Sequence, residues 1–226
     1  MSVFAATVTG RLVDLTAPEI APEHLWSEVA HGLSQLARFA GQTATAYSIA
    51  QHCVLMAEAA EDETGDPALA AHCLLHDAHE AFLGDKTSPR KRLEEAEFRA
   101  LAADNAIPDH IVTAWIARWR GDGRRGETRL DRAIWRAAGL AEPDAAMERA
   151  IAAYDLRALA TEKRDLFSGS KPWPGLPADT EPLPLRAGRI RPWPPGRAFE
   201  RFSQALGRLC PDAAAVAGRT LEGDAA

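Results

Sequence analysis

Hydrophobic residues recur three and four positions apart along most of the chain, which is the spacing of amphipathic helices. Prolines and capping residues begin several of these stretches, and glycines end them. The stretches predicted to be helical are 22–41, 45–61, 67–83, 88–105, 109–121, 128–139 and 143–167. Because helix follows helix, with no run of buried strands between them, the sequence predicts an all-α fold.

Three segments interrupt this pattern. Residues 3–15 alternate weakly around Gly10 and predict a short extended segment or a small hairpin. Residues 121–127, which read GDGRRGE, predict a loop. Residues 169–196 are rich in proline and lack helical periodicity, so they predict an ordered wrap or a linker held by Trp173 and Trp193.

After the proline-rich segment, residues 197–209 predict a short closing helix, and the tail beyond Cys210 is expected to fray. The chain therefore divides into a helical core at 1–168 and a Pro/Trp-rich extension with a short C-terminal helix at 169–226.

Composition narrows the class of protein. The chain has 226 residues, 46% of them hydrophobic, and a net charge of −6, which argues against a partner that is a nucleic-acid polymer. Its three cysteines are too few and too widely spaced for a disulfide framework or a zinc ribbon. It shows neither a signal peptide nor an apolar run long enough for a membrane span, so we expect a cytoplasmic protein without a membrane partner.

The helix predicted at 67–83 carries polar residues where a core helix would avoid them. His76 and Asp77 point ~100° apart, so both reach one point only if it lies just above the helix surface, where a metal ion would satisfy both. Glu80 lies one turn later over the same spot, and Asp85 follows the helix. The neighbouring His72 and His79 are expected beside the site or at the surface, and not as ligands.

The chain resembles the HD-domain metal-dependent phosphohydrolases, in particular the 5′-deoxynucleotidase branch and related uncharacterised bacterial and phage HD proteins. The resemblance covers residues 8–168, and a Pro-Trp-Pro-rich C-terminus like that of this chain recurs in the uncharacterised relatives. It is carried by the motifs RFAG, YSIAQHC, LLHDAHEAFLGDKTSPRK and YDLRALATEKRDLF. The resemblance implies an HD-domain helical bundle that binds one divalent metal ion.

Residue by residue, the resemblance implies a ligand set of one histidine, a His-Asp pair and a distant aspartate. These fall on His52, His76, Asp77 and Asp155. Asp131 is the rival for the last position, but it lacks the Thr-Glu-x-Arg-Asp continuation that follows Asp155.

Further residues receive roles from the same resemblance. Glu80 and Asp85 are implied as acid/base carboxylates, Arg38 as a phosphate contact, and Lys91 as a lysine at the mouth of the site. Phe39 stands where the deoxynucleotidases have an aromatic residue beside that arginine, which leaves their deoxyribose selectivity open here. Gln51 and Cys53 replace the usual glutamate and serine that flank the first histidine.

Two imidazoles and two carboxylates suit a six-coordinate metal such as Mn, Co, Fe or Ni, with Zn or Mg as alternatives. We expect an enzyme that hydrolyses the phosphate of nucleoside or deoxynucleoside monophosphates. The alternatives are an HD hydrolase of triphosphates or other phosphate esters, and a non-catalytic nucleotide-sensing protein. Trp115, Trp119 and Trp135 lie on amphipathic helices away from the metal cluster, and they lead us to expect a homodimer.

Overall fold

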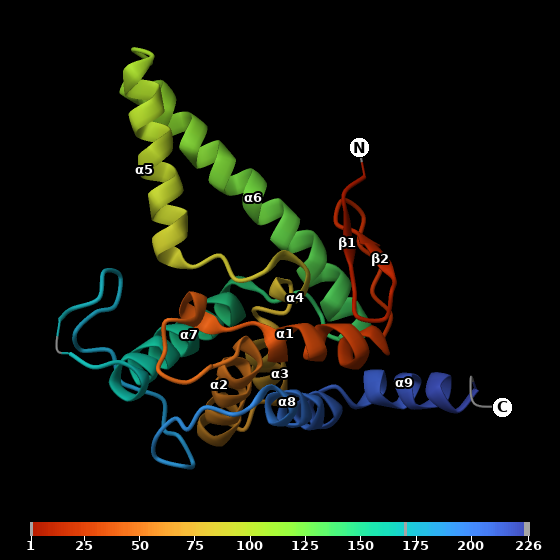
Figure 1. Cartoon of the computed structure of the whole chain (residues 1–226). Coiled ribbons are helices and arrows are strands. Elements are labelled where there is room, and N and C mark those ends of the chain that lie inside the picture. Colours follow the sequence, from red (N-terminus) through yellow and green to blue (C-terminus); the bar gives the residue numbers. More distant parts are fainter. Residues whose placement is uncertain (1, 170, 224–226) are drawn as a thin grey trace.

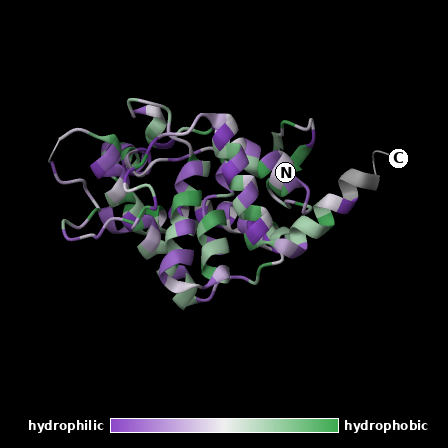
Figure 2. Cartoon of the chain, turned by 90° about the horizontal axis from the view of Figure 1, so that it is seen from below, coloured by the Kyte–Doolittle hydropathy of each residue, from purple (hydrophilic) through white to green (hydrophobic). Residues whose placement is uncertain are grey.

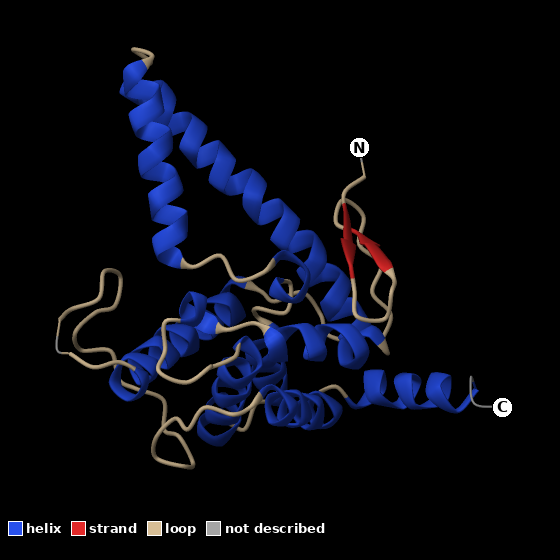
Figure 3. Ribbon diagram, in the orientation of Figure 1, coloured by secondary structure: helices blue, strands red, loops and turns tan. Residues whose placement is uncertain are grey.

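Helices make up nearly all of the regular structure, and the predicted all-α fold is confirmed (Figures 1 and 3). The computed structural model describes residues 2–169 and 171–223 and, within these, all side chains but those of 122–123 and 220–223. None of the described helices combines the length and the hydropathy needed to cross a lipid bilayer.

Two antiparallel helices, α2 (Ile49–Thr64) and α3 (Pro67–Leu75), form the centre of the molecule. Ser48 caps α2 by accepting a hydrogen bond from the Gln51 amide, and Gly65 ends the helix in the left-handed conformation with φ 66°. Most residues of the two helices are buried, which fits their alanine-rich, apolar composition. This hairpin is the rigid support of the site.

Other helices cover the central pair. The π-helical turn η1 (Leu25–Ala30) continues into α1 (His31–Gln35), which packs on α2, on α8 (Pro195–Leu209) and on α4 (Glu80–Leu83). The helix α7 (Ala145–Leu166) lies against both α2 and α3. A Cβ atom on Gly32 would lie 3.0 Å from that of Ala81, so only glycine allows α1 to approach α4 this closely. Viewed from below, hydrophobic and hydrophilic bands alternate on the central helices (Figure 2).

Two helices project from this body as an arm (Figure 1): α5 (Ser88–Asp104) and α6 (Asp109–Ala138). The arm has a small core of its own, in which Phe98 and Ile107 pack against Ala102, Val112 and Ile116. The predicted loop at 121–127 is wrong, because α6 runs through it without a break. The segment contains no proline, and packing at both ends of α6 outweighs the modest helix penalty of its glycines.

The three tryptophans that suggested a dimer interface differ in environment. Trp115 and Trp119 are 48% and 46% exposed on the arm, whereas Trp135 is partly buried against the ring of His72, 5.7 Å away. Trp135 is therefore accounted for within one chain. The homodimer stays a prediction, and the arm is the surface on which it now depends.

The helix predicted at 22–41 ends early. Leu36 and Ala37 are extended, and backbone hydrogen bonds join Arg38 to Tyr47 and Ile49 to Leu36. These tertiary bonds replace the helix, and Arg38 opens a separate 3-10 turn, η2 (Arg38–Gly41). The prediction of one helix over 22–41 is therefore wrong, and Arg38 lies outside the first helix.

The helix predicted at 67–83 is also interrupted. It breaks at His76 into a turn over 76–79, in which amides bond to the carbonyl three residues back, and α4 resumes at Glu80. The tightened turn is where the predicted His-Asp pair lies.

The proline-rich segment is an ordered wrap, as one of the two expectations had it. Side chains of α2 and α7 bind its backbone: Gln51 bonds to both Arg191 and Trp193, and Thr161 accepts the amide of Leu183. The closing helix forms α8, whose Phe202 and Leu206 join the main core. We expected the tail beyond Cys210 to fray. This expectation is wrong for the described part of the tail, because it forms the helix α9 (Pro211–Gly223).

A predicted N-terminal hairpin is present as β1 (Phe4–Ala6) and β2 (Leu12–Asp14), paired antiparallel. A buried carboxylate fastens it to the body. Glu28 on η1, with its side chain 1% exposed, accepts hydrogen bonds from Arg11, Thr7 and Thr9. Burial opposes ionisation of Glu28, but these hydrogen bonds outweigh it and hold its pKa below the ordinary value.

Replacing Arg11 with methionine should lower the free energy of unfolding by about 3 kcal/mol, because Glu28 then stays buried without its cationic partner. Denaturant unfolding at neutral pH measures this. The pKa of Glu28 is lowered by folding, so the stabilisation exists above its unfolded pKa, and the loss should shrink below about pH 4. Arg90→Met is the control: Arg90 pairs with Glu94 but is 67% exposed, and the change should be below about 0.5 kcal/mol. Equal losses in both variants would contradict a special role for the buried pair.

Candidate metal centre

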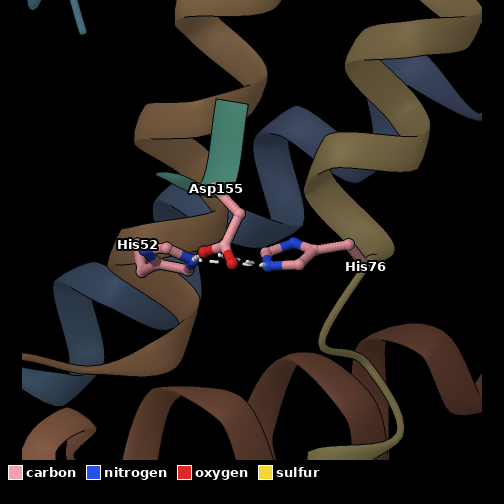
Figure 4. Close-up of side chains that lie close together, drawn as sticks. All are labelled: His52, His76 and Asp155. Atoms are coloured by element: carbon pink, nitrogen blue, oxygen red, sulfur yellow. Dashed lines mark hydrogen bonds and ion pairs between the residues drawn. The ribbon is translucent and has the colours of Figure 1, made fainter. Parts of the chain in front are cut away.

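Three segments bring the four predicted ligands together. His52 comes from the buried face of α2, His76 and Asp77 from the turn after α3, and Asp155 from α7. In Figure 4 the side chains of His52, His76 and Asp155 point toward one another. The Nε2 atom of His52 lies 3.3 Å from both His76 Nε2 and Asp155 Oδ1. Asp77 Oδ2 lies 3.1 Å from His76 Nε2 and 3.9 Å from His52 Nε2.

These separations fit a shared cation. Bonds of about 2.0–2.2 Å from a metal ion to nitrogen and oxygen place neighbouring donor atoms about 3–3.5 Å apart, and opposite ones about 4 Å apart. The structure therefore contains a group of residues able to hold a metal ion, as predicted.

Hydrogen bonds on the far side of each ring fix which nitrogen faces the centre. His52 Nδ1 lies 2.7 Å from Glu162 Oε1, and His76 Nδ1 lies 2.8 Å from the carbonyl oxygen of Cys73. The Cys73 carbonyl oxygen can only accept a hydrogen bond. Burial opposes ionisation of Glu162, but Arg38 and His52 outweigh it and hold its pKa below the ordinary value, so its carboxylate also accepts. Each Nδ1 must therefore donate, and each Nε2 of a neutral ring presents a lone pair inward.

The two Nε2 atoms stand 3.3 Å apart beside the carboxylates of Asp77 and Asp155. Burial lowers the pKa of both rings, but neighbouring groups, chiefly Glu162 for His52 and Asp77 for His76, outweigh it and raise both pKa values, so the chain without a metal favours protons on these nitrogens. A metal ion can replace these protons, because it supplies the same positive charge beside the carboxylates. The convergence of two inward Nε2 atoms and two carboxylates is the observation that most strongly favours a metal site.

A second group, formed by Cys53, His76 and Asp77, also has the composition of a metal site. It would use Nδ1 of His76, from which Cys53 Sγ is 3.9 Å away, but that nitrogen already donates to the Cys73 carbonyl. Burial also raises the pKa of the Cys53 thiol, which disfavours the thiolate that binds metals. The group around Asp155 is the better candidate.

Glu162, which sequence reasoning did not single out, connects the metal ligands to Arg38. Its side chain is 1% exposed, and it accepts from His52 and pairs with Arg38 Nε at 3.1 Å and Nη2 at 3.3 Å. Arg38 Nη1 in turn lies 3.5 Å from Asp77 Oδ2. Glu162 follows Asp155 by seven residues, two helical turns, so the spacing could have indicated that both lie on one face of α7.

The two predicted acid/base carboxylates lie next to this group. Burial, with Asp77 and Asp85 nearby, raises the pKa of Glu80 to about 8, and its Oε2 atom is buried without a hydrogen-bond partner in the described structure. Burial also raises the pKa of Asp85, with Arg38 opposing it and Asp77 adding to it. The exposed Lys91 acts on Asp85 from the start of α5.

The remaining candidates lie apart from the four ligands. Asp131, the rival for the last ligand, binds His79 Nδ1 at 2.9 Å and belongs to neither group of potential ligands in the described structure. His72 packs against Trp135, and burial lowers its pKa. The ring of Phe39 packs edge to face against two other aromatic rings, those of Phe167 and Trp173.

Comparison with known proteins now places the chain. No family model matches it. It is 31% identical to the uncharacterized protein YfdR of Escherichia coli over 187 residues, which cover 81% of this chain and 83% of YfdR. The chain belongs to the YfdR family.

A second relative of this YfdR-family chain is an uncharacterized protein of Rhodobacter capsulatus. It is 41% identical over 90 residues, which cover 37% of this chain and 44% of the relative. Neither relative's name states an activity, so the chemistry of this YfdR-family protein has to be argued from its own residues.

Because the ligands come from α2, the turn after α3, and α7, a bound ion should hold these segments together and raise the melting temperature. Chelation should therefore lower the melting temperature, and Asp155→Asn or His52→Gln should bind Mn²⁺ at least about tenfold more weakly in calorimetric titrations. Cys53→Ser serves as the control and should bind as the wild type does. Tight binding by the Asp155 and His52 variants, with loss in the Cys53 variant, would move the site to the second group.

Proposed function

We propose that the protein is a metal-dependent phosphohydrolase of the HD type that acts on nucleotides, with nucleoside or deoxynucleoside monophosphates as the first candidates. The support is the coincidence of two independent results. The motifs imply four ligands, and the side chains of the same four residues approach one another, with Nε2 of both histidines directed toward the two carboxylates.

His52, His76, Asp77 and Asp155 would hold a single divalent ion and leave coordination positions for water and a phosphate oxygen. The bound ion supplies positive charge to the phosphoryl group and lowers the pKa of its water. The mixed nitrogen and oxygen donors suit Mn, Co, Fe or Ni, with Zn or Mg as alternatives.

Arg38 is suited to bind phosphate beside the ion. Its guanidinium has five N–H donors: one on Nη2 donates to Glu162 and one on Nη1 donates to Asp77, whereas Nε, 3.1 Å from Glu162 Oε1, is buried without a hydrogen-bond partner in the described structure. The second N–H of Nη1 and that of Nη2 remain for phosphate oxygens. Burial opposes the charge of Arg38, but Glu162 and Asp77 outweigh it and raise its pKa, so the arginine stays cationic. The alternative that Arg38 only caps helix carbonyls is not supported, because its guanidinium pairs with carboxylates.

Glu80 is suited to donate a proton. A buried carboxyl with a pKa raised to about 8 holds its proton at neutral pH and can pass it to the leaving oxygen. Asp85 and Lys91 stand at the outer edge, where they would meet the rest of the substrate.

Two alternatives belong to the same scaffold: hydrolysis of triphosphates or other phosphate esters, and nucleotide sensing without catalysis. The presence of every ligand and of both carboxylates disfavours the second. Assaying the purified chain with Mn²⁺, Co²⁺ or Mg²⁺ against mono-, tri- and cyclic nucleotides tests the proposal. Chromatography of the nucleotides detects every product of the panel, and hydrolysis of none of them, under any of these metals, would reject the hydrolase.

Glu80→Gln should keep its metal but lose about 10²-fold or more in kcat, because the amide cannot supply the proton. Metal content and steady-state rates on the best substrate of the panel measure the two effects separately. Glu97→Gln, an exposed glutamate on α5, is the matched control and should turn over normally. A Glu80→Gln protein with the wild-type rate would remove Glu80 from the mechanism.

Arg38→Lys should fold and keep its metal, yet lose about tenfold or more in kcat/KM, equivalent to roughly 1.4 kcal/mol of transition-state stabilisation. Lysine keeps the charge but lacks the planar fork that binds two phosphate oxygens at once. Arg157→Lys is the control, since Arg157 also pairs with a carboxylate, that of Glu63, but outside the ligand group. Unchanged kinetics in Arg38→Lys would show that the fork does not contact phosphate.

A further inference from the structure

Three aromatic rings from separate parts of the chain meet beside Arg38. Phe39 comes from η2, Phe167 follows the last turn of α7, and Trp173 lies in the proline-rich extension. The ring centroid of Phe39 is 4.9 Å from that of Phe167 and 5.8 Å from that of Trp173, and the latter two are 4.8 Å apart. We call these three rings the aromatic wall.

Backbone strain accompanies the placement of the first ring. Phe39 and Ala40 have φ values of 57° and 51°, in the left-handed region that costs a non-glycine residue about 1–2 kcal/mol. The cost is tolerated where surrounding structure fixes the conformation, here the backbone hydrogen bond from Arg38 to Tyr47 just before it. Two such residues in succession next to the proposed phosphate contact are typical of a functional segment.

The rings of the wall do not cover one another. Their planes cross at 66–79°, so each contact is edge to face and occupies one face of one ring. Arg38 Cζ lies over the ring of Phe39, 5.4 Å from its centroid. Phe39, Phe167 and Trp173 are all partly exposed, and the residues on either side of Trp173 are exposed. Trp173 therefore lies in an exposed stretch of the extension, where a ligand can reach its ring.

We propose that the aromatic wall binds the base of the nucleotide whose phosphate lies between Arg38 and the metal ligands. This inference rests on the proposed function and deepens it, because it assigns the residues that would hold the base. Arg38 connects the two parts: Nη1 lies 3.5 Å from Asp77 Oδ2, and Cζ lies 5.4 Å from the ring centroid of Phe39 in the wall. A ligand with a phosphate at one end and a flat aromatic group at the other matches this arrangement.

The competing explanation is structural: the wall only anchors the extension to the end of α7. The two explanations differ in what happens to ligands that lack a base. A base-binding wall discriminates adenosine 5′-monophosphate from ribose 5-phosphate, whereas an anchor affects both ligands alike.

The test measures binding of these two compounds to the full, Mn²⁺-loaded chain by calorimetry, each as a phosphonate analogue whose C–P bond replaces the ester bond, so that no hydrolysis occurs. The nucleotide should bind about tenfold or more tightly than ribose 5-phosphate, the scale of one stacking contact. Trp173→Leu should remove this difference and leave ribose 5-phosphate binding unchanged. Trp173→Phe should restore most of it, and Trp115→Leu, an exposed tryptophan on the arm, should have no effect.

The outcomes separate this inference from the proposed function. Equal affinity of the wild type for the two compounds, or an equal loss for both in Trp173→Leu, would overturn the aromatic wall even if the metal-loaded enzyme hydrolyses phosphate esters. Base-dependent binding that requires Trp173, in a protein that hydrolyses nothing, would support the wall and reject the hydrolase.

Discussion

The site depends on one electrostatic constraint: two imidazole Nε2 atoms and two carboxylates point at a common centre. Each histidine is held in this orientation by an acceptor behind it, the Glu162 carboxylate for His52 and the Cys73 carbonyl for His76. Rotating either ring would abandon a buried hydrogen bond, a loss of about 1–3 kcal/mol. The two carboxylates favour positive charge between α2, α7 and the turn after α3, which protons on the rings or a metal ion can supply, and a metal ion is a cation that this donor set suits.

Glu162 extends the constraint to the substrate side. Its carboxylate is shared between His52 and Arg38, so one buried anion both orients a metal ligand and fixes the arginine proposed to bind phosphate. Arg38 reaches back to Asp77, so the arginine pairs with two carboxylates. Buried charges of this kind are tolerated only when each has a partner, so the proposed metal binding and phosphate binding would be coupled through the same few side chains.

The sequence predicted what is local or carried by a motif. Apolar periodicity located α2, α3 and α7, and the motif resemblance selected the four residues that converge. The role of Glu162 was not predicted, because it depends on which atom of His52, a residue of another helix, faces it. The early end of α1 was not predicted, because a backbone bridge between Ala37 and Ser48 outweighs helix propensity. Such errors arise where a tertiary contact decides the local structure.

The hydrogen bonds of Gln51 explain why this chain has glutamine where the resemblance expects glutamate beside the first histidine. Gln51 accepts a hydrogen bond from the Trp193 amide and donates one to the Arg191 carbonyl. Glutamate has no N–H for the second bond. On α7, Thr161 beside Glu162 binds the Leu183 amide. Gln51 and Thr161, which adjoin His52 and Glu162 in the sequence, therefore hold the proline-rich extension in place. The extension, which carries Trp173, is bound to the same two helices, α2 and α7, that position the candidate metal centre.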